Sequence, residues 1–136
     1  MRTLIADDDP VYLGLVDGLL DQWGYETVLA TNGVQAWELL QADESIRLVV
    51  LDWMMPEMDG FEVCRKVRAA DLGRDVYILL MTGSNRKEDI IQVVVAGADD
   101  YLIKPFEPLD LKIRLRSARR ILDLQAELAR YRQAEG

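Results

Sequence analysis

Five short apolar runs alternate along this chain with longer segments in which apolar residues recur at helical spacing. The apolar runs lie near residues 2–6, 26–30, 47–51, 76–81 and 100–103, and the helical segments cover 10–23, 33–42, 60–70, 87–96 and the chain from Pro108 onward. Apolar runs this short, bounded by turn residues, are typical of buried strands. Strands that alternate with helices predict an α/β fold, in which helices cover both faces of a parallel sheet.

Helical spacing and end signals predict local detail. Helical spacing places Val11, Leu15, Leu19 and Leu20 on one face of the first helix, and it likewise groups Ile90, Ile91, Val94 and Val95 on the fourth. Asp9 before Pro10 is expected to cap the first helix, and Gly97 is expected to end the fourth. We expect the only cysteine, Cys64, to be a buried packing residue.

The last helical segment is long, and its apolar stripe changes phase. Leu111, Leu115, Ala118 and Leu122 form a face expected to pack on the sheet. A second face, rotated by one residue or about 100°, is formed by Ile121, Leu124, Leu128 and Tyr131. Its 3-4-3 spacing is that of a coiled-coil seam. We therefore expect a domain over 1–120 and a helical extension over 121–136, which is a coiled-coil linker, a homodimer contact or a frayed tail.

Charge and composition exclude several classes of function. The chain has 136 residues, enough for one domain, and no histidine, so Ser-His-Asp catalysis and His-ligated zinc are excluded. Residues 1–111 hold 9 basic and 21 acidic side chains, a net charge of −12, whereas residues 112–136 hold 7 and 3, a net charge of +4. Such an acidic body disfavours nucleic acid as a partner. No apolar run approaches the ~20 residues of a membrane span, so we expect a cytoplasmic protein without a membrane partner.

Charged residues follow three of the apolar runs. Asp7 and Asp8 follow the first run, Asp52 follows the third, and Lys104 follows the fifth. Open α/β sheets bind ligands outside the carboxyl ends of their strands, so we expect these groups to converge there. Three carboxylates would repel one another without a cation, and a hard cation, Mg²⁺ or else Mn²⁺, suits such oxygen ligands.

A carboxylate in such a cluster has a chemical use. Asp52, at its centre, is a candidate nucleophile toward phosphorus. Lys104 and the hydroxyl of Thr82, which follows the fourth run, are candidate partners for phosphoryl oxygens.

In this arrangement the chain resembles a response-regulator receiver domain of the two-component signalling family, of the chemotaxis-regulator type, across residues 2–120. The motifs that carry the resemblance are Leu-Ile-Ala-Asp-Asp-Asp (4–9), Leu-Asp-Trp-Met-Met-Pro-Glu-Met-Asp-Gly (51–60), Met-Thr-Gly (81–83) and Gly-Ala-Asp-Asp-Tyr-Leu-Ile-Lys-Pro-Phe (97–106). The resemblance implies a doubly wound, flavodoxin-like sheet of five parallel strands in the order 2-1-3-4-5.

The resemblance also implies a role for each site residue. Asp52 would be the phosphoacceptor, and Asp7, Asp8, Asp52 and the backbone carbonyl of Met54 would hold Mg²⁺. Thr82 and Lys104 would contact the phosphoryl group, and Thr82 and Tyr101 would form a conformational switch. Residues at the positions of Met54 and Ser84 influence how fast the acyl phosphate hydrolyses. The phosphoryl donor would be a sensor histidine kinase or a phosphotransfer protein.

The pattern leaves one expected function and two alternatives. We expect the receiver part of a larger or dimeric regulator, which is not an enzyme but assists its own phosphorylation and dephosphorylation. It would signal through the fourth helix, the fifth strand and the last helix. The alternatives are a free-standing receiver and a Mg²⁺-dependent phosphatase that uses an aspartyl phosphate. The haloacid-dehalogenase pattern needs a second Asp two residues after the nucleophile, where this chain has Met54. A scaffold without phosphorylation is disfavoured, because every site position is filled.

Overall fold

The computed structural model describes residues 1–135, in which strands and helices alternate strictly. Residue 136, the last of the expected extension over 121–136, lies outside the described residues. The strands are β1 (Arg2–Ala6), β2 (Glu26–Ala30), β3 (Ile46–Asp52), β4 (Tyr77–Thr82) and β5 (Asp100–Ile103). The helices are α1 (Pro10–Gln22), α2 (Gly33–Ala42), α3 (Gly60–Ala69), α4 (Lys87–Ala96) and α5 (Pro108–Glu135).

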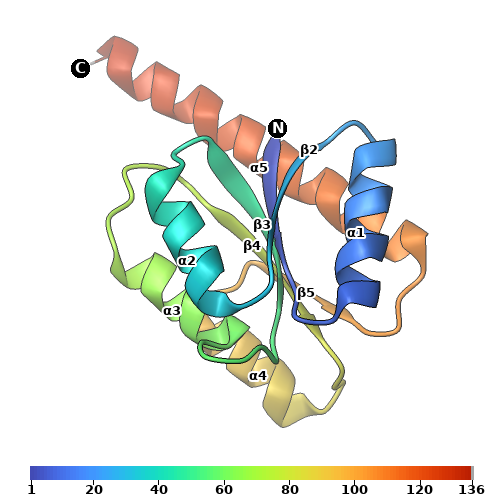
Figure 1. Ribbon diagram of the computed structural model, residues 1–136. Coiled ribbons are helices and arrows are strands. Elements are labelled where there is room, and N and C mark those ends of the chain that lie inside the picture. Colours follow the sequence, from blue (N-terminus) through green and yellow to red (C-terminus); the bar gives the residue numbers. More distant parts are fainter. Residues whose placement is uncertain (136) are drawn as a thin grey trace.

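The strands form one parallel sheet in the order β2-β1-β3-β4-β5. Helices α1 and α5 cover one face of this sheet, and α2, α3 and α4 cover the other (Figure 1). The predicted fold class, strand order and extended last helix are therefore confirmed.

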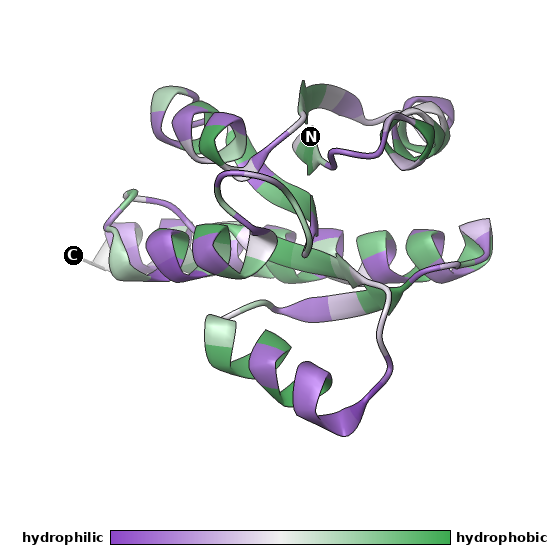
Figure 2. Cartoon of the chain, turned by 60° about the horizontal axis from the view of Figure 1, so that its bottom comes forward, coloured by the Kyte–Doolittle hydropathy of each residue, from purple (hydrophilic) through white to green (hydrophobic). Residues whose placement is uncertain are grey.

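Two hydrophobic clusters hold the layers together, one on each face of the sheet. Every residue of β4 is buried, because helices shield both of its faces. Figure 2 shows central strands that are largely hydrophobic and helices striped with hydrophilic and hydrophobic residues. The central strands therefore meet solvent mainly at their two ends, which is where a site can form.

The predicted local signals are present. The Asp9 side chain accepts a hydrogen bond from the Val11 N–H at 2.9 Å, and Pro10 is the first residue of α1. Gly97 ends α4 in the left-handed conformation, with φ of 95°. Cys64 is buried, and its burial raises the pKa of the thiol to about 12, so it is a packing residue as expected.

The apolar residues grouped by helical spacing on α1 and α4 are buried only in part. In α1, Val11 and Leu15 are exposed, and the buried residues are Val16 and Leu20. In α4, Ile91, Val94 and Val95 are exposed, whereas Val93 and Ala96 are buried. Both helices carry apolar residues on more than one side, so periodicity alone did not determine which side meets the sheet.

Helix α5 shows both of its predicted faces. Leu111, Leu115, Ala118 and Leu122 are buried against the sheet, whereas Ile121, Leu124, Leu128 and Tyr131 are exposed. The last turns of the helix extend past the body of the domain (Figure 1). Within residues 1–135, no helix combines the length and apolar character that crossing a membrane requires.

Candidate functional site

The strand register brings the predicted site residues to one edge of the sheet. Ala6 of β1 pairs with Leu51 of β3, so Asp7 lies next to Asp52. Thr82 of β4 pairs with Ile103 of β5, and the Lys104 N–H donates to the Thr82 carbonyl at 2.7 Å. The carboxyl ends of four parallel strands thus present their side chains to one crevice.

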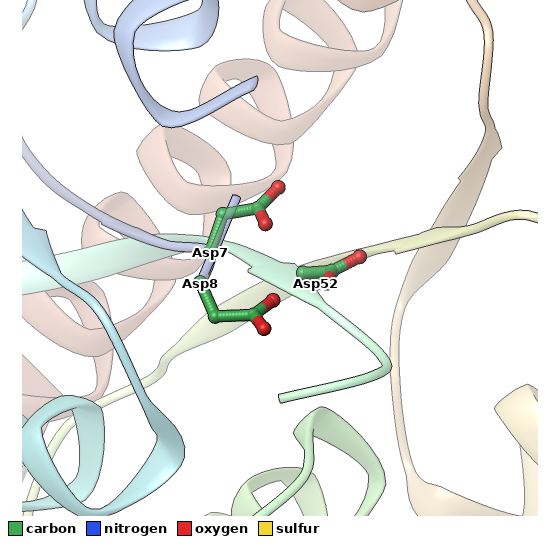
Figure 3. Close-up of side chains that lie close together, drawn as sticks. All are labelled: Asp7, Asp8 and Asp52. Atoms are coloured by element: carbon green, nitrogen blue, oxygen red, sulfur yellow. The ribbon is translucent and has the colours of Figure 1, made fainter. Parts of the chain in front are cut away.

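Three carboxylates meet in this crevice. Asp7, Asp8 and Asp52 each offer an oxygen, and these oxygens lie within 4.8 Å of one another (Figure 3). Asp7 is fully buried and Asp52 is 8% exposed, whereas Asp8 is exposed to solvent. The Asp9 N–H donates to Asp7 Oδ1 at 2.9 Å and fixes that carboxylate. One open side and a set of hard oxygen ligands fit a cation that keeps some of its waters, as Mg²⁺ does.

Lys104 supplies a positive charge inside the cluster. Its Nζ lies 2.8 Å from Asp7 Oδ2 and 3.1 Å from Asp52 Oδ1. Nζ also lies 4.0 Å from the centroid of the Tyr12 ring, a cation–π contact. Burial acts to lower the pKa of the ammonium, but the hydrogen bonds to Asp7 and Asp52 outweigh it and raise the pKa. One ammonium leaves the cluster with an excess of negative charge.

That excess appears in the protonation of Asp52. Burial and the neighbouring charge of Asp7 raise the pKa of Asp52 to about 6, although Lys104 opposes the shift. An added cation would favour the ionised form of Asp52, because opposite charge stabilises a carboxylate. The ionised form is the one that acts as a nucleophile.

Thr82 and Ser84 lie on the loop that follows β4. The Thr82 hydroxyl is buried and accepts a hydrogen bond from the Ser84 N–H at 3.2 Å. The Ser84 hydroxyl donates to Asp89 on α4, and this bond lowers the pKa of Asp89. Ser84 is therefore held toward α4. Thr82, Ser84 and Met54 line a hollow of about 240 Å³, and the Met54 side chain is 75% exposed there.

Tyr101 lies farther from the carboxylates. It belongs to β5, two residues before the register partner of Thr82, and its half-buried side chain packs on the hydrophobic cluster beneath α2, α3 and α4. Arg114 Nε on α5 donates to its carbonyl at 2.8 Å. Tyr101 therefore connects β5 to α5.

Two contacts at the site were not expected from the sequence. Tyr12 carries the cation–π contact with Lys104, and only the folded chain brings together residues so far apart in sequence. Gly60 packs so closely on β3 that an added Cβ would lie 2.2 Å from the Asp52 carbonyl oxygen. The Gly60 N–H also donates to the Trp53 carbonyl at 2.8 Å. The Asp-Gly pair at 59–60 signalled a turn, but no local pattern signalled this close approach.

Comparison with known proteins agrees with this geometry. The family model of the response regulator receiver domain matches residues 3–116. The chemotaxis protein CheY1 of Helicobacter pylori is 37% identical over 116 residues, which cover 85% of this chain and 94% of the relative. The transcriptional regulator RpaA of Synechocystis is 37% identical over 133 residues, which cover 96% of this chain and 54% of the relative.

A solved structure shows the same fold. The receiver domain of the sensor histidine kinase PA1611 from Pseudomonas aeruginosa, which has magnesium coordinated in its active-site cleft, has a TM-score of 0.77 and 29% identity. The match covers 88% of this chain and 94% of that structure. With fold, sequence and relatives in agreement, this chain belongs to the response regulator receiver domains of two-component signalling.

Proposed function

We propose that the chain is a phosphorylation-dependent switch whose phosphoacceptor is Asp52. One observation carries the proposal, namely that three carboxylate oxygens lie within 4.8 Å of one another while Lys104 reaches two of these side chains. The donor is a phosphohistidine on a sensor histidine kinase or on a phosphotransfer protein, which supplies the histidine that this chain lacks.

Asp7, Asp8 and Asp52, with the backbone carbonyl of Met54, would hold Mg²⁺, and Mn²⁺ would meet the same oxygens. The bound cation supplies positive charge to the oxygens of the transferring phosphoryl group. The donor set supports this assignment, because carboxylate and carbonyl oxygens are the ligands that these ions prefer. The magnesium in the cleft of the PA1611 receiver domain supports it further.

In the transfer step, a carboxylate oxygen of Asp52 attacks phosphorus and the bond from phosphorus to the donor nitrogen breaks. The nitrogen keeps the electron pair, and the product is an acyl phosphate on Asp52. Lys104 exchanges its contact with Asp52 for one with a phosphoryl oxygen, and the Thr82 hydroxyl donates to another. Hydrolysis later returns the carboxylate and inorganic phosphate, and Met54 and Ser84 tune its rate from the adjoining hollow.

The phosphoryl group would shift a two-state equilibrium. Turning Thr82 toward the phosphoryl group frees space behind it, and Tyr101 moves into that space. Because the Tyr101 carbonyl accepts a hydrogen bond from Arg114 of α5, this movement would also shift α5. The signalling surface is therefore the face formed by α4, β5 and α5. On α4, the side chains of Ile91, Val94 and Val95 are exposed.

We propose further that residues 1–120 form the receiver and 121–136 a helical extension that joins it to an output module or to a second copy. The exposed seam on α5 supports this arrangement. The relatives include both organisations, since the match spans 94% of CheY1 but 54% of RpaA. A free-standing receiver is the alternative.

The experiment is phosphorylation by a small donor. Incubation with phosphoramidate and Mg²⁺ should add one phosphoryl group per chain, detected by mass spectrometry and removed by hydroxylamine, which cleaves acyl phosphates. Asp52→Asn should abolish the addition, and the exposed Asp75→Asn should leave it unchanged. Chelation of Mg²⁺ should abolish it in both the native chain and the control.

Two outcomes would contradict the proposal. Full phosphorylation of Asp52→Asn would place the phosphoacceptor elsewhere. Many turnovers of p-nitrophenyl phosphate per chain would favour the phosphatase, because a switch reacts stoichiometrically and holds its phosphoryl group.

A further inference from the structure

A second hollow, of about 380 Å³, lies at the opposite end of the sheet from the acidic crevice. It is bounded by the residues after α1, among them Trp23 and Tyr25, and by the middle of α5. Tyr25 immediately precedes β2, so the hollow lies at the amino ends of the parallel strands. Helices α1 and α5, which bound the hollow, lie side by side on the same face of the sheet (Figure 1). The volume falls within the roughly 300–1,000 Å³ of small-molecule sites.

The wall that α5 contributes is strongly basic. Lys112, Arg116, Arg119 and Arg120 line the hollow, against the single carboxylate of Asp123. Their spacing places them along one side of the helix over about 12 Å. Among the side chains of residues 1–134, none of these four cations forms an ion pair within 4.0 Å.

This arrangement is unfavourable for the isolated chain. Like charges three or four residues apart on a helix repel each other. The rest of the protein is acidic and could have supplied partners for these side chains, yet the described structure pairs them with none. Four unpaired cations around one concave surface therefore point to an anion from outside the chain.

The two aromatic residues hold part of this cationic wall in place. Lys112 Nζ lies 5.6 Å from the Trp23 ring centroid, and Arg119 Cζ lies 5.3 Å from that of Tyr25. A cation–π contact orders the side chain without using its N–H groups, which stay available to an acceptor. Arginine guanidinium groups match phosphate oxygens in pairs, and lysine meets phosphate as a point charge. Trp23 lies half-buried beside them and packs on the hydrophobic cluster of this side of the sheet.

We propose that this hollow binds a chain of linked phosphates, carried either by inorganic oligophosphate or by a nucleoside di- or triphosphate. A single phosphate is too small to engage cations spread over about 12 Å of helix, whereas two or three linked phosphates span more of them. The proposal does not depend on Asp52 or on Mg²⁺. It would give the receiver a second input, read at α5, at the end of the sheet away from the phosphoacceptor.

Isothermal titration calorimetry on the full chain tests the proposal. Chelator is present throughout, so that the acidic crevice holds no cation to attract phosphate. Affinity should rise in the order phosphate, pyrophosphate, tripolyphosphate. If ATP binds more tightly than tripolyphosphate, the ligand is a nucleotide and the aromatic wall contributes. Equal or weaker binding of ATP assigns the hollow to the inorganic chain.

Matched double variants distinguish specific binding in the hollow from nonspecific attraction to a basic helix. Arg116→Gln with Arg119→Gln should weaken tripolyphosphate binding at least tenfold. Arg130→Gln with Arg132→Gln removes the same charge from the same helix outside this hollow and should change the affinity less than twofold. Circular dichroism melting checks that both variants fold. Asp52→Asn should bind as the native chain does, which separates this proposal from the phosphorylation switch.

Three results would overturn the proposal. The first is no heat with any of the phosphate probes at millimolar concentration. The second is equal weakening by both double variants, which would indicate nonspecific attraction to a basic helix. The third is a short DNA duplex that binds more tightly than tripolyphosphate and responds equally to both variants, which would make α5 a polyanion surface without a small-ligand site.

Discussion

At the scale of single residues, the acidic crevice holds more negative than positive charge, which is electrostatically unfavourable. Asp7 is fully buried, Asp52 nearly so, and a single ammonium, that of Lys104, reaches both. The raised pKa of Asp52 reflects this excess of negative charge, because folding favours the neutral acid over the carboxylate relative to the unfolded chain. The same property that prepares the crevice for a cation therefore makes it costly when no cation is bound.

The first prediction concerns stability against pH, without divalent cations. A pKa raised from 3.8 to about 6 means that Asp52 contributes stability below about pH 4, and that this contribution is lost as the pH rises through about 6. Asp52→Asn should therefore increase the free energy of unfolding by about 1–2 kcal/mol near neutral pH, and by almost nothing near pH 4. Urea unfolding at both pH values measures this difference. Asp75→Asn is the control, and a variant less stable than the native chain at neutral pH would contradict the argument.

The second prediction concerns the lifetime of the proposed acyl phosphate. Met54 is 75% exposed beside the crevice, and its apolar side chain is a poor partner for the water that must attack phosphorus. Met54→Asn should speed dephosphorylation several-fold in the presence of Mg²⁺, measured as loss of the phosphoryl group over time. Met54→Leu, which stays apolar, should leave the rate nearly unchanged. Equal rates in all three proteins would remove Met54 from the mechanism.

At the scale of elements, the site depends on how closely α3 approaches the end of β3. Gly60 begins α3, and a Cβ there would clash with the Asp52 carbonyl. The side chain of Asp59 caps the same helix by accepting from the Glu62 N–H at 2.8 Å. Helix start and strand end thus form one unit that fixes the backbone from which the Asp52 carboxylate projects.

The third prediction tests that unit without changing any charge. Gly60→Ala should lower the free energy of unfolding by about 1–3 kcal/mol, because the backbone must move to admit the methyl group. It should also slow phosphorylation by phosphoramidate. Gly83→Ala is the matched control, since an added Cβ at Gly83 would meet nothing within 4 Å. Thermal melts and phosphorylation rates of both variants give the comparison. Equal stability and equal phosphorylation rates in the two variants would mean that the backbone around Gly60 accommodates the methyl group without cost.

Elements also show where sequence reasoning succeeded and where it failed. Bounds of strands and helices were predictable because caps, glycines and apolar runs are local signals, as at Asp9 and Gly97. The convergence of Asp7, Asp52 and Lys104 was expected because each follows an apolar run, and the carboxyl ends of parallel strands meet at one edge of the sheet. The orientation of α4 was not predictable, because its apolar residues surround the helix and only packing selects Val93 and Ala96. The contact between Tyr12 and Lys104 was invisible for the same reason, since it exists only in the packed structure.

At the scale of the molecule, α5 packs on the sheet with its first part and extends past the domain with its last turns. Its first apolar face ends at the buried Leu122, and its second begins at the exposed Ile121. Four apolar side chains in a coiled-coil spacing are costly to leave in water, so they favour association with a second copy.

The fourth prediction is that this association occurs and depends on the seam. Sedimentation at micromolar concentration, with and without beryllofluoride as a phosphoryl mimic, should show a dimer whose share rises with the mimic. Leu128→Gln, on the seam, should shift the protein toward monomer. Ala129→Gln, one residue off the seam, should not. A native chain that remains monomeric under both conditions would contradict a homodimer contact.

The continuity of α5 has a mechanical consequence. Beyond Leu122 the helix continues for 13 residues to Glu135, about 20 Å at 1.5 Å per residue. An arm of this length converts rotation at its base into displacement at its tip, and a tilt of about 5° moves the tip by roughly 2 Å. A small tilt of α5 on the sheet therefore becomes a larger displacement at its free end. The length of the helix, rather than the strength of any single contact, sets the size of that displacement.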